Sequence, residues 1–391
     1  MMIAAFWLAV LGLFALATRL GRQLNLIPIV SQLLLATFGI PLLMLFWVEP
    51  KWQLSGAQLI APVWLKTLYG LSFAVVLGHI LSDVIEVRLD RQSLKVALPS
   101  FAVPFVCGVA CAGWMLPSQS GLSTLAFGLV FAITAIPVLY LYLHHIGYPL
   151  EATRRLVQTA ILIDLACWSL FGLAQGSLHL SSLALPLLGA CTPIALRLLN
   201  IRQARLHGLV FFALLMVAEH YTLNALILGI GYLLCMKALR QSFALPLKAS
   251  WFKALQQYLA IPLILTFGIV QINIHSAMGD LGWLNLLILI VVPIVSKLLG
   301  NWIGVRWATP SFAGAVRWKE ALLLNIRGLS EIVFLNLLLQ EGLITPSLYF
   351  ALMSMSLIAT LLPALAGMSR PLPSYDVNAV KHSKRKPCAN S

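Results

Sequence analysis

A polar stretch, Asn325-Ile326-Arg327-Gly328-Leu329-Ser330-Glu331, interrupts an otherwise apolar segment that runs from about residue 320 to residue 340. The segment has the length of a bilayer-spanning helix, which needs about 20 apolar residues. Backbone that leaves the helix at that depth persists only where protein buries it or where it lines an aqueous cavity. The stretch therefore predicts a discontinuous helix within a membrane protein, with Arg327 or Glu331 neutralising the exposed helix ends.

A second interruption, Thr134-Ala135-Ile136-Pro137, falls in the apolar segment over residues 121–143. Pro137 removes a helical donor and frees a carbonyl group, so an ordinary kink explains this stretch equally well when it is taken alone. The two interruptions lie in the fifth and twelfth apolar segments, which run in opposite directions across the bilayer. Segments 4–6 and 11–13 then form an inverted pair, which indicates a secondary transporter with its binding site near the bilayer midplane.

The composition excludes a soluble protein. Of the 391 residues, 60% are hydrophobic and only 10% are charged, whereas globular domains are about 45–50% apolar and about 25% charged. The chain is therefore an integral membrane protein, and its short connections leave room for many spans. Thirteen apolar segments are predicted, at about residues 2–18, 26–48, 64–86, 96–116, 121–143, 156–176, 180–196, 207–218, 221–236, 254–274, 282–305, 320–340 and 344–368.

The basic residues predict the orientation of these segments. The net charge is +14, which in a soluble protein would indicate nucleic acid or an acidic partner. All but four of the 26 Lys and Arg residues lie in the odd-numbered connections or in the tail; the four are Lys51, Lys66, Lys297 and Arg327. Because basic residues collect on the cytoplasmic side, the N-terminus is expected outside and the C-terminus inside, with no nucleic-acid partner. The basic run near Lys384 is a solvated tail or a contact for anionic lipid headgroups.

Several function classes lack their motifs. The sequence contains no phosphate-binding glycine-rich loop, no His-Glu-x-x-His motif, and no cysteine spacing typical of zinc or of a disulfide framework. We therefore expect neither an enzyme nor a cofactor, and we expect any transport to draw on an ion gradient.

Four ionisable residues lie well inside apolar segments: Asp164, Lys297, Arg327 and Glu331. Each costs about 2.5–3.5 kcal/mol to insert at the bilayer centre, so such residues are usually functional. Asp164 is the only carboxylate in its helix. It either fixes helix packing through a hydrogen bond or alternately takes up a proton and a cation, because burial and nearby cations tune the proton affinity of a carboxylate in opposite directions. Lys297 needs a partner at that depth, and Asp164 is the obvious candidate.

Five stretches resemble, in order, the motifs of monovalent cation/proton antiporters, which carry a sodium/hydrogen exchanger domain. The match covers about residues 20–368, and the Asp-x-Ala-x-Trp form at residues 164–168 resembles the cation:proton antiporter-2-like branch of plant and bacterial cation/H⁺ exchangers. The five stretches are residues 131–139, 158–168, 261–273, 296–300 and 325–331.

The resemblance implies an all-α antiporter fold of about thirteen helices with inverted repeats and two crossed discontinuous helices. It implies a transmembrane domain over residues 1–370, with core helices at about 96–176 and 282–368 and dimerisation helices at about 2–86 and 207–274. A short basic cytoplasmic tail over residues 371–391 follows. We expect a homodimer in the bilayer of a bacterial inner membrane, working by elevator-like alternating access.

The resemblance also implies residue roles. Asp164 is the carboxylate that binds the transported ion, Na⁺ or K⁺, and the exchanged H⁺; Thr134 lies near the ion, and Lys297 is the charge partner. The crossing and its charge compensation involve Pro137, Asn325, Arg327, Gly328 and Glu331.

One departure from the family pattern leaves alternatives open. Ile163 stands where the family commonly has Asn, Asp or Gln directly before the key aspartate, so a polar ligand is missing. Gln32 likewise stands where a glutamate is frequent. A non-transporting membrane sensor or assembly component on an antiporter scaffold is therefore a second hypothesis. A third is an organic-anion symporter in which Arg327 holds a carboxylate.

Overall fold

The computed structural model describes residues 2–23, 28–82, 90–115, 120–176, 180–221, 223–271, 274–310, 313–363 and 365–366. About 85% of the described residues are helical, and none of them lies in a β-strand. The prediction of an all-α polytopic protein is confirmed. The predicted tail over residues 371–391 and the end of the third predicted segment, at residues 83–86, lie outside the described residues.

The first three predicted segments form a run of helices in which prolines disturb the α-helical hydrogen bonding. Pro41 lies in the first turn of the short α3, and Pro50 lies inside the π-helical segment η2, which is followed by Gln53 with a left-handed backbone. The elements are α1 (Met2–Gln23), α2 (Pro28–Leu34), η1 (Leu35–Gly39), α3 (Ile40–Leu43), η2 (Met44–Trp52), α4 (Gly56–Ile60) and α5 (Val63–Ser82).

The next four helices contain the first interruption. A long helix with two internal prolines, Pro99 and Pro104, precedes the interrupted helix, and a second long helix follows it. The elements are α6 (Arg91–Met115), α7 (Gly121–Ala132), α8 (Ile136–His145) and α9 (Leu150–Gly176).

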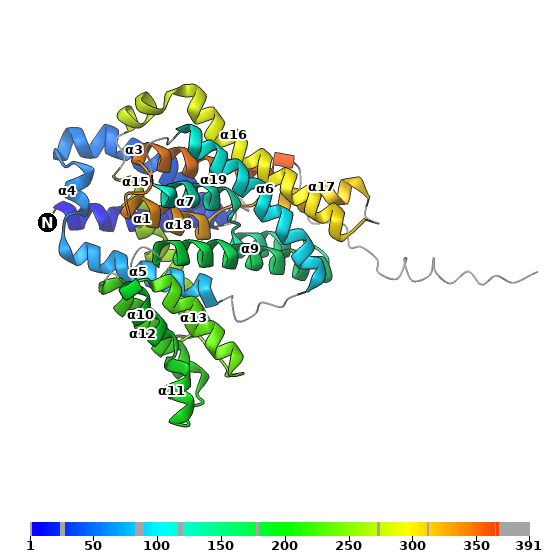
Figure 1. Cartoon of the computed structure of the whole chain (residues 1–391). Helices are drawn as coiled ribbons and strands as arrows, with labels where there is room; N and C mark the ends of the chain where they lie inside the picture. Colours follow the sequence, from blue (N-terminus) through cyan, green and yellow to red (C-terminus); the bar gives the residue numbers. More distant parts are fainter. Residues whose placement is uncertain are drawn as a thin grey trace, which may run out of the picture.

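The middle of the chain contains α10 to α15. The predicted division of residues 207–236 into two segments is confirmed, because α12 and α13 are separate helices. In Figure 1 the helices α10 to α13 form a group that projects from the rest of the molecule. The elements are α10 (Leu180–Ala190), α11 (Thr192–Leu198), α12 (Ala204–His220), α13 (Ala225–Ala238), α14 (Ala249–Leu255), η4 (Gln256–Ala260) and α15 (Ile261–Ile269).

The last four helices repeat the order of α6 to α9: a long helix, an interrupted helix and another long helix. The long helix α16 bends at Gly282, whose φ of 68° suits glycine because it has no Cβ. The two long helices α6 and α16 pack along each other, which brings the two halves of the fold together (Figure 1). The elements are α16 (Ile274–Ala308), α17 (Gly314–Leu323), α18 (Leu329–Gln340) and α19 (Pro346–Pro363).

The helices fit a membrane in length and composition. In the described part of the chain, eight helical stretches are long and apolar enough to span a bilayer, and five shorter apolar helices accompany them. These stretches correspond one for one to the thirteen predicted segments.

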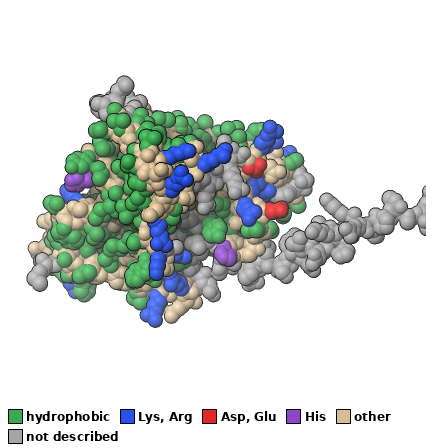
Figure 2. All heavy atoms as spheres, turned by 90° about the horizontal axis from the view of Figure 1, so that it is seen from below, with side chains coloured by type: hydrophobic (Ala, Val, Ile, Leu, Met, Phe, Trp, Pro, Cys, Tyr) green, Lys and Arg blue, Asp and Glu red, His purple; other side chains and the backbone are tan. Residues whose placement is uncertain are grey.

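The outer surface is apolar as well. Large side chains such as Leu8, Val106 and Trp283 are mostly exposed, which a monomer in water would rarely tolerate over so wide an area. Figure 2 shows one face, on which hydrophobic side chains dominate and Lys and Arg side chains gather instead of spreading evenly.

Candidate functional site

Both predicted interruptions are present in the backbone. The helix α7 ends at Ala132, residues 133–135 are not helical, and α8 begins at Ile136 with Pro137 in its first turn. Proline suits that position, because the first helical N–H groups have no partner within the helix. The helix α17 ends at Leu323, and α18 begins after residue 328.

The two interruptions contact each other. The N–H of Ala135 donates to the carbonyl oxygen of Ile326 at 3.3 Å. Gly328 permits the approach, because a Cβ at that position would lie 2.8 Å from Cγ2 of Val138 and 3.4 Å from Cβ of Ala135. The structure thus places the two non-helical stretches, nearly 200 residues apart in the sequence, at one crossing.

Asp164 of α9 reaches this crossing. Its side chain is 3% exposed, and Oδ1 accepts the main-chain N–H of Thr134 at 3.0 Å. That N–H lies just before the start of α8, where the helix dipole favours negative charge. The hydroxyl of Thr134 is fully buried and has no hydrogen-bond partner among the described residues. Carboxylate, hydroxyl and main-chain groups therefore gather at one buried point.

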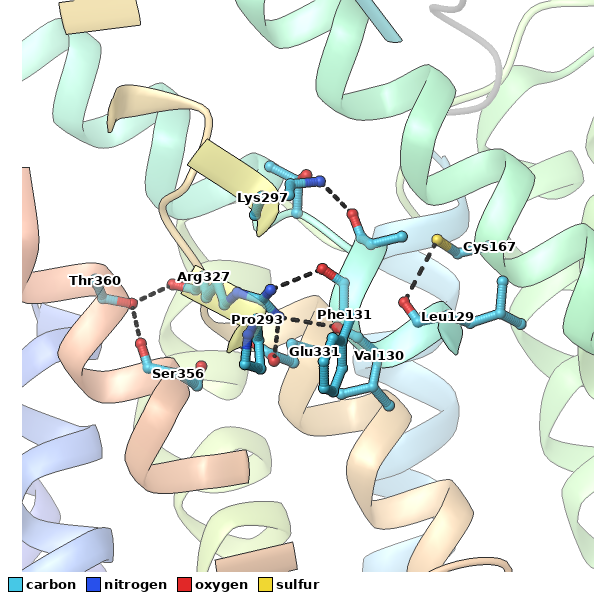
Figure 3. Close-up of polar contacts among 12 residues, drawn as sticks. Leu129, Val130, Phe131, Cys167, Pro293, Lys297, Arg327, Glu331, Ser356 and Thr360 are labelled. Carbon is cyan, nitrogen blue, oxygen red and sulfur yellow. Dashed lines mark hydrogen bonds and ion pairs between the residues drawn. The ribbon is translucent and has the colours of Figure 1, made fainter. Parts of the chain in front are cut away.

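Arg327 binds the end of α7 across the crossing (Figure 3). Its Nη1 donates to the carbonyl oxygen of Val130 at 2.8 Å, and its Nη2 donates to that of Phe131 at 2.7 Å. Carbonyl groups in the last turn of a helix have no partner within the helix. Nη1 also lies 2.7 Å from Oε1 of Glu331, which sits in the first turn of α18. One guanidinium therefore joins the end of α7 to the start of α18.

Lys297 of α16 binds the last carbonyl group of α7. Its Nζ donates to the carbonyl oxygen of Ala132 and to that of Ser100 in α6, the second at 3.2 Å. The Ser100 carbonyl has no helical donor, because the residue four positions later is Pro104, which lacks an N–H. Lys297 therefore satisfies two carbonyl groups that the backbone leaves without a partner. Its predicted role as the charge partner of Asp164 stays a prediction.

The fourth terminal carbonyl group of α7, that of Leu129, completes the set. It accepts the N–H of Ile133 at 3.0 Å, and Sγ of Cys167 lies 3.9 Å from it. Cys167 and Trp168 follow Asp164 on α9, and the Trp168 ring meets the ring of Phe334 edge to face. All four end carbonyl groups of α7 are thus satisfied, and two of the donors are cations.

The four intramembrane charges lie in one region, and each side chain is at most 3% exposed. Two are negative and two are positive, so the region is neutral when Asp164 is ionised. On the second repeat, the Thr360 hydroxyl lies 2.6 Å from the carbonyl oxygen of Arg327 and 2.7 Å from that of Ser356 (Figure 3). The crossing is held by side chains of α9, α16 and α19.

Sequence reasoning missed a second charged contact. Arg155 of α9 and Glu320 of α17 form an ion pair, with Nη2 2.5 Å from Oε1. The hydroxyl of Tyr148 lies 3.4 Å from the same carboxylate oxygen. Glu320 itself could have been singled out in the sequence, because it is a carboxylate at the edge of a predicted span. Nothing in the sequence indicated its partner 165 residues away.

The chemistry of this crossing suits a small cation and a proton. The buried carboxylate can bind either one, and oxygen atoms of hydroxyl and carbonyl groups can replace the hydration shell of an alkali ion.

Comparisons with known proteins bear on the fold. No family model matches the chain, and no curated protein does. Among solved structures, that of the sodium proton antiporter MjNhaP1 from Methanocaldococcus jannaschii at pH 8 is similar, with a TM-score of 0.58. The similarity covers 94% of this chain and 98% of that chain at 14% sequence identity. The chain therefore has the fold of a sodium/proton antiporter, as the sequence predicted.

Proposed function

We propose that this protein is a secondary active antiporter that exchanges a monovalent cation, Na⁺ or K⁺, for H⁺ by alternating access. In this proposal Asp164 is the carboxylate that the cation and the proton occupy in turn. Thr134 contributes an oxygen to the cation, and Lys297 and Arg327 balance the charge of the site.

The observation that carries the proposal is the placement of Asp164 at the crossing of two interrupted helices. Its carboxylate is buried and accepts an N–H from the non-helical Thr134. A buried carboxylate is costly, and packing alone would not require one beside non-helical backbone. The same arrangement, with a site near midplane, is typical of secondary transporters.

The charges support an exchange of one cation for one proton. Asp164, Glu331, Lys297 and Arg327 sum to zero when all are ionised. Binding of either Na⁺ or H⁺ to Asp164 then raises the charge of the site by one. Because both loaded states carry the same charge, exchange through this single carboxylate is electroneutral. In proteoliposomes the ion gradient at which net exchange stops is therefore expected to be independent of an imposed membrane potential.

The test is dissipation of a pH gradient in everted membrane vesicles after addition of Na⁺ or K⁺. The wild-type chain is expected to dissipate the gradient, and Asp164→Asn is expected to abolish this. Glu49→Gln is a matched control, because Glu49 is an exposed carboxylate distant in sequence from the crossing. Cation-dependent dissipation that survives Asp164→Asn would refute the role of Asp164. A series over Li⁺, Na⁺, K⁺ and Rb⁺ identifies the cation.

A second candidate function rests on Ile163. This side chain is 1% exposed and apolar beside Asp164, which favours a sensor or assembly component that no longer transports. Absence of ion-dependent proton flux in proteoliposomes, with a phenotype that survives loss of Asp164, would establish that candidate. The organic-anion alternative is less well supported, because both terminal nitrogens of Arg327 already donate to protein oxygens. Uptake of labelled organic acid would revive it.

The homodimer, the division into core and dimerisation helices, the branch of the family, the inner-membrane location and the orientation of the termini stay predictions. Cross-linking in native membranes tests the dimer. Protease or thiol-reagent access from each side tests the orientation.

A further inference from the structure

Asn325 is the last residue before the contact between the two interruptions, and its side chain is fully buried. Neither its Oδ1 nor its Nδ2 has a hydrogen-bond partner among the described residues. A buried amide without partners is costly, so proteins normally supply partners for such groups. A bound ligand at the crossing would supply one.

Asn325 is not needed to cap α17. The end carbonyl groups of that helix already have donors at 3.0–3.1 Å: Leu324 N–H to Glu320, Asn301 Nδ2 to Ala321, Asn325 N–H to Leu322, and Ile326 N–H to Leu323. The main-chain N–H of Asn325 caps α17, but its side-chain amide does not. The side-chain amide is therefore available to bind a ligand.

Asn325 lies next to the contact between the two interruptions. The carbonyl oxygen of Ile326, the next residue, accepts the N–H of Ala135. The residue before Ala135 is Thr134, whose N–H binds Asp164. Asn325 and Thr134 therefore each stand one residue from the same contact. Both side chains are fully buried, and each carries an oxygen without a partner among the described residues.

The apolar Ile163 explains why a cation would need the side-chain oxygen of Asn325 as a ligand. At that position α9 offers no polar side chain beside Asp164, so the first repeat alone supplies few side-chain ligands to an ion. An amide carbonyl oxygen is a suitable ligand for an alkali cation, because it replaces water of hydration without adding charge.

We propose that Oδ1 of Asn325 is a ligand of the transported monovalent cation, so that both interrupted helices contribute to its oxygen shell. This inference rests on the proposed antiport function. It makes Asn325 a specificity-determining residue in addition to Asp164 and Thr134. The cation, and not the proton, is the species whose binding depends on it, since a proton needs only the carboxylate.

The test compares Asn325→Leu, Asn325→Asp and the matched control Asn336→Leu. Asn336 is also buried, but its amide donates to Ile332 and Tyr349. Purified protein is titrated with Na⁺ or K⁺, and the cation-dependent rise in melting temperature and the KM for the cation are measured. Asn325→Leu is expected to weaken cation binding about tenfold or more, the scale of one charge-assisted contact. Asn325→Asp keeps an oxygen and is expected to retain binding.

The outcomes separate this inference from the proposed function. Loss of cation-dependent stabilisation in Asn325→Leu, with retention in Asn325→Asp and Asn336→Leu, supports it. Unchanged stabilisation in Asn325→Leu overturns it even where Asp164→Asn abolishes transport. If the wild-type chain shows no flux, the thermal titration still tests the cation ligand. The inference is also overturned if cations stabilise neither the wild type nor any variant.

Discussion

The ion pair between Arg155 and Glu320 gives a prediction whose size follows from burial. The pair joins α9, the helix of Asp164, to α17, the half-helix that leads into the second interruption, and Nη2 lies 2.5 Å from Oε1. The Glu320 side chain is 1% exposed and that of Arg155 is 12% exposed. Arg155→Met therefore leaves a carboxylate in a buried place without its cation.

The cost of this change has a ceiling that depends on pH. The protein can always neutralise the unpaired carboxylate of Glu320 by binding a proton. This protonation costs about 1.36 kcal/mol for each pH unit above the usual glutamic acid pKa of about 4.3. That ceiling is about 3.7 kcal/mol at pH 7 and about 1 kcal/mol at pH 5. The value at pH 7 agrees with the range of about 3–5 kcal/mol for breaking a buried pair. The destabilisation is thus expected to shrink as the pH falls.

Equilibrium unfolding in mixed micelles, followed by helical circular dichroism at pH 7 and pH 5, measures this. Arg155→Met is compared with Glu320→Gln and with the double variant. The double variant is expected within about 1 kcal/mol of the wild type, because removing both charges avoids the stranded carboxylate. An equal cost of Arg155→Met at both pH values, or a double variant no more stable than Arg155→Met, would refute the reasoning.

Three further substitutions test close contacts. Gly268→Ala would put a Cβ 2.3 Å from the Tyr349 hydroxyl and 2.6 Å from Oδ1 of Asn336. It is therefore expected to lower the free energy of unfolding by about 1–3 kcal/mol, and an unchanged free energy of unfolding contradicts this. Gly328→Ala is expected to push the two interruptions apart and reduce the exchange rate, because its Cβ would lie 2.8 Å from Cγ2 of Val138. Adding Val138→Ala is expected to restore the rate, and an unchanged rate in Gly328→Ala contradicts this. Gln32→Leu removes donors 2.8 Å from a main-chain oxygen and 3.1 Å from a hydroxyl, at an expected cost of about 1–3 kcal/mol in unfolding free energy; an unchanged free energy contradicts it.

The two interruptions could be predicted because their causes are local. Pro137 cannot donate a helical hydrogen bond, and the polar stretch with Gly328 has no place in a continuous span facing lipid. The structure breaks both helices at these stretches, at residues 133–135 and 324–328. The thirteen segments were predictable for a similar reason, because each needs only its own apolar length.

The partners of the charged residues were harder to predict, because they are set by tertiary contacts. Sequence reasoning pairs Lys297 with a carboxylate, since opposite charges attract. In the structure its ammonium group binds carbonyl oxygens of Ser100 and Ala132. One part of this was readable in the sequence: Pro104 frees the carbonyl group four residues before it. That α7 ends beside the same ammonium group depends on the packing of α6, α7 and α16, which no local pattern records.

The two halves of the crossing hold their carboxylates differently, and this difference supports the proposal that Asp164 exchanges the cation and the proton. Oε1 of Glu331 lies 2.7 Å from Nη1 of Arg327, four residues earlier in the chain. Protonation of Glu331 would therefore remove the charged partner of that guanidinium. Asp164 accepts a neutral N–H from Thr134. A neutral donor can stay bonded to a carboxyl oxygen whether the group holds a cation or a proton. In the proposed exchange this contact can therefore persist when the occupant of Asp164 changes, while Arg327 keeps the end of α7 joined to the start of α18.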